Sequence, residues 1–417
     1  MVKKLYGTPT LALALGGFLL WAANQFKNTE EPTAFVWRMP LDLNIYVLAG
    51  AELAAGKDLY DNPFIGKLPF TYPPFAGVLF EWLSYLEEDT VIAVWQFGTM
   101  AALAVVLLLV LRNRGIKLTF GAIVVAFLFA LASVATEPLH GTLFFGQINV
   151  FLLLLVSLDF LPRRFRFPGI GIGLAAGLKL TPAFLGLVLL FQKRFWVALA
   201  SIVTFGLTIA IGWWLIPDAK YFWTEGMFQS DRVGDHSNPG AQSLRSVLSR
   251  VFGIESPWPW LVGVAIIFAF TCLAVWVAVR KKDAATAMAL TGISACLISP
   301  FSWYHHWVWI IPLAFVVLIA VNQAIGSALP GFFGAQVAGL GSLLAAAVVL
   351  LPFVSVHVAK PFAYRTLDDV ESLQPWASLT FVGAGAIYIL GYGVVGLIFA
   401  LRSPAKGGRH RLAKARV

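Results

Sequence analysis

The sequence predicts an all-α protein that crosses a membrane many times. Hydrophobic residues make up 59% of its 417 residues and charged residues only 12%, whereas soluble domains carry about 25% charged residues. The mean hydropathy is +0.80. Apolar stretches that approach the roughly 20 residues of a spanning helix recur along the whole chain. This composition excludes a soluble globular protein.

The apolar stretches predict the positions of the helices. Together with a shorter pair of arms within residues 168–192, they predict about twelve membrane-embedded helices. The ten longer stretches lie near 8–23, 90–111, 118–136, 147–161, 195–216, 259–279, 284–300, 306–323, 332–354 and 377–401.

Charge alternates between the connections, which predicts how the chain threads. One set of connections holds 19 of the 30 Lys and Arg residues: Lys3 and Lys4, 112–117, 163–166, 193–194, 280–282 and the tail 402–417. The other set holds 19 of the 21 carboxylates, all but Asp159 and Asp283. Because basic loops stay in the cytoplasm, we expect a multi-pass plasma membrane protein with both termini cytoplasmic. The basic tail is expected to anchor on anionic membrane lipids, not on nucleic acid.

Residues 168–192 lie between two basic clusters and are too short for two full spans. We expect a short, broken helical hairpin with "GLKLTP" at its tip. Broken backbone at membrane depth is tolerated only where it lines a protein cavity. That cavity would hold Lys179, whose charge requires an anionic partner. The partner would be Asp42 in a buried ion pair, or a phosphate of a substrate.

The whole chain, 1–417, is expected to form one membrane-embedded domain. Its polar mass lies in three connections on the outer side: 24–89, 217–258 and 353–376. Large polar outer loops on a helical base favour an enzyme that works at the outer membrane surface. A transporter is the alternative, but its polar groups would concentrate near the midplane of repeated halves.

Asp42 is the first candidate for chemistry. It lies in "MPLDLNIYVLAG", among apolar residues that would raise the pKa of a carboxyl group. The stretch looks like a helix, so Asp42 is its N-cap, a general base that removes a hydroxyl proton, or both, with one oxygen held by the helix start and the other free.

Aromatic and amide side chains supply candidate substrate contacts. Tyr60 and Tyr72 lie before Pro73-Pro74, which would begin a new helix. They would bind an apolar sugar face or an isoprenoid chain, or only form an interfacial belt. Gln147 and Asn149 stand at an outer helix–helix turn and would bind a polar substrate, unless Asn149 is only a cap.

The stretch "DHSNPGAQSLRSVLSR" reads as a turn followed by an amphipathic helix. His236, Gln242 and Ser243 are candidate substrate ligands. Arg245 is a candidate phosphate ligand near the helix start, where backbone amides also favour anions.

The last candidate stretch is "ISPFSWYHHWVWIIP". His305 and His306 open a membrane helix on the outer side, and Trp303 is the aromatic candidate beside them. Adjacent residues point about 100° apart on a helix, so both histidines would rarely bind one metal. We expect no metal and no other cofactor. At least one of the two histidines is expected to bind a phosphate or a sugar hydroxyl.

Five segments in this order resemble the polyprenol-phosphate-mannose-dependent α-1,2-mannosyltransferases of actinobacteria, glycosyltransferase family 87. They are "DLNIYVLAGAELAAGKDLYD…LPFTYPPFAGVLF", "FGQINVFLLLLVSLDFL", "AAGLKLTPAFLGLVLL", "NPGAQSLRSVL" and "SPFSWYHHWVWIIP". The resemblance spans roughly residues 35–315.

The resemblance implies a GT-C membrane fold with a catalytic aspartate in the first outer loop, where this chain has Asp42. It implies a polyprenyl-phosphate mannose donor and a mannosylated lipid acceptor, a phosphatidylinositol mannoside or lipomannan. Lys179, Arg245, His305 and His306 would then bind the donor phosphate. A GT-C transferase that uses another polyprenyl-linked sugar remains the alternative within this fold.

Overall fold

The computed structural model describes residues 3–27, 38–162, 167–354 and 375–402. Within these ranges every regular element is a helix, and β structure is limited to isolated bridges. The α-helices are α1 (Thr8–Lys27), α2 (Leu41–Ala54), α3 (Pro74–Glu81), α4 (Glu88–Asn113), α5 (Phe120–Ala132), α6 (Glu137–Phe145), α7 (Asn149–Phe160), α8 (Ile170–Leu178), α9 (Gly186–Phe191), α10 (Phe195–Leu215), α11 (Ala219–Thr224), α12 (Leu244–Phe252), α13 (Pro257–Arg280), α14 (Ala284–Ile298), α15 (Ile310–Ala328), α16 (Gly331–Leu350) and α17 (Pro375–Arg402).

Short 3-10 helices extend or join several of them. They are η1 (Trp82–Tyr85), η2 (Ser133–Ala135), η3 (Thr181–Leu185), η4 (Gly226–Phe228), η5 (Ser230–Arg232), η6 (Tyr304–Trp309) and η7 (Leu351–Phe353).

All ten predicted apolar stretches lie in helices, but fewer than twelve of the described helices are long enough to span a membrane. Six described helices meet the length and hydropathy expected of a span, and α6 with α7, bent by 116°, adds a seventh if the pair is one span. The segments Phe120–Ala135, Thr181–Phe191 and Ala284–Ile298 are apolar but shorter. At 1.5 Å per residue, a 15-residue helix reaches only about 22 Å, against a hydrocarbon core of about 30 Å.

The helices divide into a buried centre and an apolar periphery. Of the spanning segments, Tyr304–Ala328 is 67% buried and α4 is 56% buried, whereas α10 is only 17% buried. The exposed side chains of α10 are large and apolar, among them Trp196, Ile202 and Trp214. Such a face suits a lipid surface and not water.

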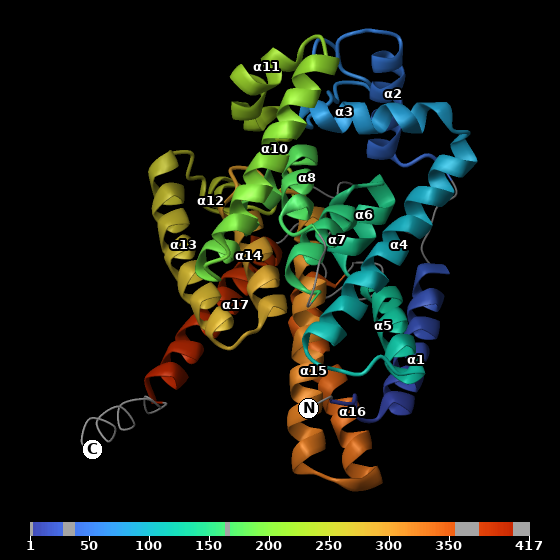
Figure 1. Cartoon of the computed structure of the whole chain (residues 1–417), viewed down its shortest axis with the longest axis vertical. Coiled ribbons are helices and arrows are strands. Elements are labelled where there is room, and N and C mark those ends of the chain that lie inside the picture. Colours follow the sequence, from blue (N-terminus) through green and yellow to red (C-terminus); the bar gives the residue numbers. More distant parts are fainter. Residues whose placement is uncertain (1–2, 28–37, 163–166, 355–374, 403–417) are drawn as a thin grey trace, which may run out of the picture.

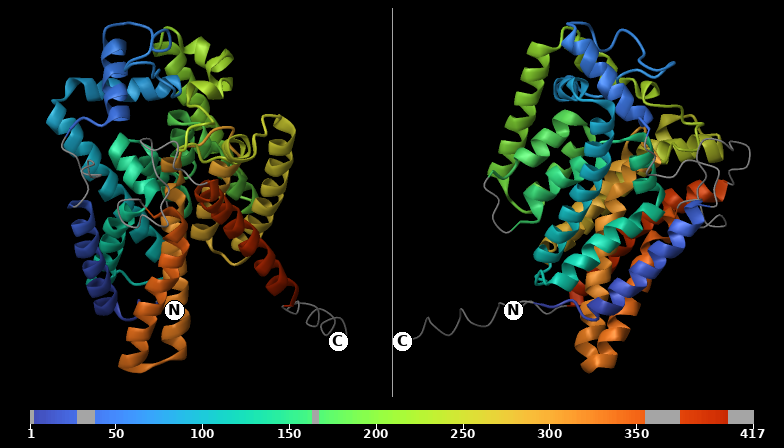
Figure 2. Two further views of the ribbon diagram at one scale, coloured as in Figure 1. Left: turned by 180° about the vertical axis from the view of Figure 1, so that it is seen from behind. Right: turned by 90° about the vertical axis from the view of Figure 1, so that its right-hand side faces the viewer.

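The long axis of the molecule separates two ends. Helices α2, α3 and α11 lie together at one end, and the α15–α16 hairpin forms the other (Figures 1 and 2). Helix α8 packs against α7 and α10, while η3 and α9 pack against α14 and α13. The site described below lies where these groups of helices meet.

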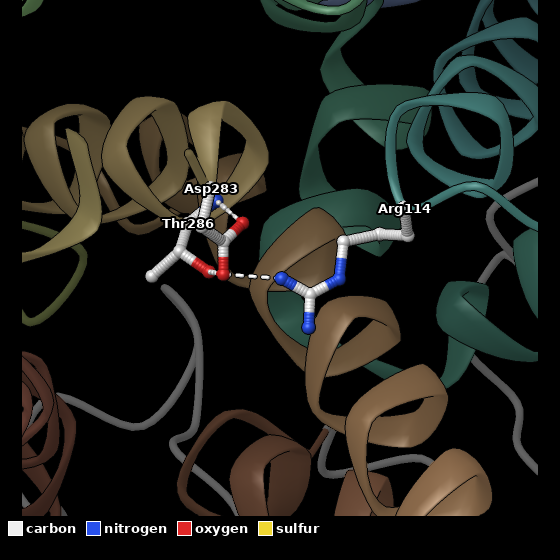
Figure 3. A network of polar contacts seen from close by, with 3 residues as sticks. All are labelled: Arg114, Asp283 and Thr286. Atoms are coloured by element: carbon white, nitrogen blue, oxygen red, sulfur yellow. Dashed lines mark hydrogen bonds and ion pairs between the residues drawn. The ribbon is translucent and has the colours of Figure 1, made fainter. Parts of the chain in front are cut away.

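Asp159 and Asp283, the two carboxylates in the basic connections, both hold helix starts. Asp159 accepts hydrogen bonds from the backbone N–H groups of Gly169 and Ile172 at the start of α8, at 2.6 and 2.7 Å. Asp283 is the N-cap of α14, where it accepts from Thr286, and it forms an ion pair with Arg114 (Figure 3). A carboxylate is favourable at the positive end of a helix dipole, which explains why these two occur among basic residues.

Residues 163–166, most of the outer loop 353–376 and the tail beyond residue 402 lie outside the described residues, as do residues 28–37 of the first outer loop. The predictions made for them stay predictions.

Candidate active site

Asp42 lies in the first turn of α2, as the sequence predicts, but it does not cap the helix. The N-cap is Pro40, and no side chain makes a capping hydrogen bond. Oδ2 of Asp42 instead accepts a 2.5 Å hydrogen bond from Nε2 of Gln147. Burial raises the pKa of Asp42 to about 6, although the hydrogen bond from Gln147 and the charge of Lys179 act to lower it. A carboxyl group with this pKa is suited to act as a general base near neutral pH.

Gly146 brings Gln147 to Asp42. It ends α6 in the left-handed conformation, with φ of 70°, which glycine adopts without strain. A Cβ atom at this position would lie 2.6 Å from Cβ of Leu43 and 2.9 Å from Cβ of Pro40. Only glycine therefore lets the α6–α7 turn approach the start of α2 this closely.

Lys179 lies at the predicted break in the helical hairpin. It is the C-cap of α8 in extended backbone conformation, and η3 begins two residues later. Its Nζ lies 3.4 Å from Oε1 of Gln147, 3.2 Å from Oδ1 of Asn149 and 3.0 Å from Nε2 of His306. The ammonium also lies 5.3 Å from the centre of the Tyr72 ring. Neutral polar groups and an aromatic face surround this charge, and no carboxylate lies within ion-pair distance of it among the described residues.

The two histidines lie on η6, and both line the cavity. Nδ1 of His306 accepts from the backbone N–H of Trp303 at 3.2 Å, so its Nε2 is the nitrogen that carries the proton. His305 is 4% exposed, and neither of its ring nitrogens has a hydrogen-bond partner among the described residues. Its backbone oxygen accepts from the side chain of Asn149 at 2.8 Å, which ties η6 to the start of α7.

These groups line one cavity of about 690 Å³, within the usual range for small-molecule sites. Seven of the residues predicted from the sequence lie on its wall, although they come from distant parts of the chain. They are Asp42, Tyr72, Gln147, Lys179, Trp303, His305 and His306. Asn149 lies behind Lys179, on a much smaller adjoining cavity.

The other predicted residues support the site from behind or lie away from it. Tyr60 donates to the backbone oxygen of Tyr72 at 2.8 Å. His236 binds Ser246. Ser243 caps α12, and the backbone N–H of Gln242 donates to Ser302. The guanidinium of Arg245 lies over the Trp260 ring, 5.6 Å from its centre. None of these five predicted residues is on the cavity wall.

Arg232 and Tyr46 are among the cavity residues that the sequence analysis missed. Arg232 lies against the rings of Tyr60 and Tyr221, and it donates to the backbone oxygen of Phe70 at 3.0 Å. The available signal was a basic residue in an outer loop, where most charges are acidic. Tyr46 gave no signal, because a tyrosine one turn after Asp42 is equally typical of a helix core.

The described part of the chain holds no group of three or more His, Cys, Asp or Glu side chains suited to a metal ion. Both cysteines are free thiols.

Known proteins resemble this chain over most of its length. Residues 70–300 match glycosyltransferase family 87. A polyprenol-phosphate-mannose-dependent alpha-(1-2)-phosphatidylinositol pentamannoside mannosyltransferase of Mycolicibacterium smegmatis is 33% identical over 359 residues, which cover 84% of this chain and 82% of the relative. A Mycobacterium tuberculosis protein of the same description is 33% identical over 357 residues, 84% of this chain and 78% of the relative.

A second Mycobacterium tuberculosis protein is described as a polyprenol-phosphate-mannose-dependent alpha-(1-2)-phosphatidylinositol mannoside mannosyltransferase. It is 29% identical over 338 residues, 74% of this chain and 78% of the relative. No solved structure matches the chain significantly.

The helical architecture, the cavity and these relatives define a multi-pass membrane glycosyltransferase. More narrowly, the chain belongs to glycosyltransferase family 87.

Proposed function

We propose that the protein is an inverting α-1,2-mannosyltransferase that moves mannose from polyprenyl-phosphate mannose to a phosphatidylinositol mannoside. The names of the relatives support the donor, the linkage and the acceptor class. The observation that carries the proposal is the placement of Asp42 and Lys179 on one cavity, where both contact Gln147.

Asp42 is the general base of the proposed reaction. It takes the proton from the 2-hydroxyl of the acceptor mannose while that oxygen attacks the anomeric carbon of the donor. The bond between the anomeric carbon and the phosphate oxygen breaks on the opposite face. A β-linked donor thus gives an α product and free polyprenyl phosphate.

Lys179 and His306 bind the phosphate as it leaves. Nζ of Lys179 and Nε2 of His306 lie 3.0 Å apart, and both residues line the cavity. When both nitrogens carry a proton, a phosphate oxygen beside them accepts a hydrogen bond from each. Positive charge and hydrogen bonds placed where negative charge develops lower the barrier to the reaction.

The topology expected from the sequence completes the proposal. The active site faces the outer side of the plasma membrane, both termini are cytoplasmic, and the helices adopt the GT-C arrangement, in which the short apolar helices are embedded beside the full spans. Figures 1 and 2 place α2 and α11, which flank the site, at the end away from the α15–α16 hairpin. This separation supports an active site near one membrane surface.

The acceptor has alternatives. The relatives described above support a phosphatidylinositol mannoside and hence an enzyme of the PimE type. A transferase that branches lipomannan or lipoarabinomannan would use the same donor and linkage. Another polyprenyl-phosphate sugar is a further alternative. An alpha-(1->3)-arabinofuranosyltransferase of Corynebacterium glutamicum is 28% identical over 262 residues, which keeps that alternative open.

The test compares purified wild type with Asp42→Asn. Each receives labelled polyprenyl-phosphate mannose and a phosphatidylinositol mannoside, and the lipid product is resolved by mass. Removing a general base should lower kcat by about 100-fold or more. Asp61→Asn is the matched control, because Asp61 is an exposed carboxylate of the same outer loop that does not line the cavity.

An Asp42→Asn protein as active as wild type contradicts the role of Asp42. A wild type that transfers mannose to lipomannan but not to phosphatidylinositol mannoside contradicts the acceptor alone. If intact substrate equilibrates across the membrane of vesicles that contain the protein, and no new glycosidic bond forms, the protein is a transporter.

A further inference from the structure

Gln147 has a different role from the one that its place in the sequence suggests. The sequence predicts a substrate ligand, but the structure engages both ends of its amide with protein. Its Nε2 donates to Oδ2 of Asp42 at 2.5 Å. Its Oε1 accepts from the hydroxyl of Tyr72 at 2.9 Å and lies 3.4 Å from Nζ of Lys179.

The hydrogen bonds that link Tyr46, Tyr72, Gln147 and Asp42 form a chain in which every donor points toward Asp42. The hydroxyl of Tyr46 lies 2.6 Å from the hydroxyl of Tyr72. A hydroxyl has one proton to give, and an ionised carboxylate can only accept. Since Tyr72 gives its proton to Gln147, Tyr46 must give its proton to Tyr72. The amide of Gln147 therefore presents its NH₂ group to Asp42.

This chain is shielded from water. Tyr46 is 1% exposed, Tyr72 is 7% exposed and Gln147 is 6% exposed. The ring of Tyr46 stacks on Phe80 at 4.2 Å between centres and meets the edge of the Tyr72 ring at 5.2 Å. Buried polar groups are held firmly because breaking one bond leaves an unsatisfied partner.

We propose that Gln147 is a positioning residue which, with Tyr72 and Tyr46, holds Oδ2 of Asp42 and so leaves Oδ1 to take the proton from the acceptor hydroxyl. The proposal rests on the proposed function, because it takes Asp42 as the base. Oδ1 has no hydrogen-bond partner among the described residues, whereas Oδ2 is bound by Gln147.

The charge on Asp42 depends on few other groups. Lys179 at the end of α8 lowers its pKa, and among the described residues Tyr46 and Tyr72 are the other ionisable groups that interact with its charge. His305 and His306 stand beyond Lys179 and couple to it instead. The elements packed against α2 are α3, η1 and α6. These elements carry four further ionisable residues: Glu81, Tyr85, Glu137 and His140.

The experiment measures kcat, the acceptor KM and the pH dependence of kcat/KM for Gln147→Met, Tyr72→Phe and Tyr46→Phe. The substrates are synthetic polyprenyl-phosphate mannose and a phosphatidylinositol mannoside. Gln147→Met removes a hydrogen bond to the charged form of Asp42. The fall of kcat/KM on the acid side of the pH profile, its acid limb, should therefore move to a pH about one unit higher. Tyr72→Phe should shift it less and Tyr46→Phe least, because each acts through the next residue of the chain.

Tyr388→Phe is the matched control. Its hydroxyl donates to the backbone oxygen of Val349 at 2.8 Å and does not line the cavity. This variant loses a partly buried tyrosine hydrogen bond, but the acid limb of its pH profile should stay where it is in wild type. A graded shift in the first three variants and none in the fourth supports a positioning role over a general effect on folding.

Two results overturn the proposal in different ways. If Asp42→Asn is inactive but Gln147→Met raises the acceptor KM and leaves the acid limb unmoved, then Gln147 binds sugar and the proposed function stands. If Asp42→Asn is fully active, Asp42 is not the base, and the positioning role of Gln147 fails with it while mannosyl transfer by the wild type stands. Should Gln147→Met elute as an aggregate, Gln147→Glu has the same shape, and its carboxylate would compete with Asp42 for a proton and move the acid limb upward. An unmoved limb in that variant also overturns the proposal.

Discussion

Nζ of Lys179 lies 3.0 Å from Nε2 of His306, although 127 residues separate them in the sequence. One residue stands at the break after α8 and the other on η6, and the two meet on the wall of the cavity. Their contact joins two sequence motifs into a single candidate anion site, from which the first prediction follows.

Replacing Lys179 with Met should lower kcat by about 100-fold or more, because a positioned charge that stabilises a developing anion contributes that much. Lys179→Arg should retain more activity, since it keeps the charge but places it in a planar group. Single-turnover rates with saturating donor would measure the effect on the chemical step. A Lys179→Met rate close to that of wild type would show that the phosphate leaves without this charge.

The rate should depend on pH through Asp42. The base must be ionised, and burial raises its pKa to about 6. We therefore expect kcat/KM to fall about tenfold per pH unit below pH 6 and to level off above it. Lys179→Met removes a charge that lowers this pKa, so its acid limb should lie at higher pH. A profile that is flat down to about pH 4.5, near the ordinary range for Asp, would contradict the assignment.

Arg232 and Arg245 allow a direct comparison within one outer loop. Arg232 lines the cavity, whereas Arg245 lies over Trp260 and does not. We expect Arg232→Gln to raise the KM of a substrate by about tenfold, the value of one charged hydrogen bond. Arg245→Gln should leave both substrate KM values near those of wild type. The reverse pattern would restore the phosphate role that the sequence predicts for Arg245.

The ion pair between Arg114 and Asp283 should contribute to stability and not to catalysis, because it joins the end of α4 to the start of α14 away from the cavity (Figure 3). Its side chains are 22% and 11% exposed. Since the pair is partly buried, its loss in Arg114→Gln should cost about 1–3 kcal/mol.

Thermal unfolding in detergent would then show a lower Tm for Arg114→Gln, with kcat unchanged at 25 °C. Asn is also a good N-cap, so Asp283→Asn should lose the ion pair while keeping the start of α14. If the losses in Tm of Arg114→Gln and Asp283→Asn simply add in the double variant, the two side chains do not interact.

Much of the local structure could be predicted from the sequence. Each of the ten long apolar stretches lies in a helix, because the cost of burying polar groups in lipid acts on each segment by itself. Local rules also located three details: the start of α3 at Pro74, the break at Lys179 and the amphipathic helix α12. The sequence did not predict how many of these helices span the membrane fully, because several apolar helices are shorter than the thickness of a bilayer.

The sequence by itself determined the class of the protein and singled out Asp42 and Lys179 as candidates for chemistry, because an isolated Asp or Lys among apolar residues is costly wherever the chain folds. Only the tertiary structure decided which polar residues share the cavity. It placed Arg232 on the wall and Arg245 off it, and it turned Gln147 toward Asp42 through Tyr72 and Tyr46. Such choices depend on distances between helices far apart in the chain, and composition and spacing carry no information about those distances.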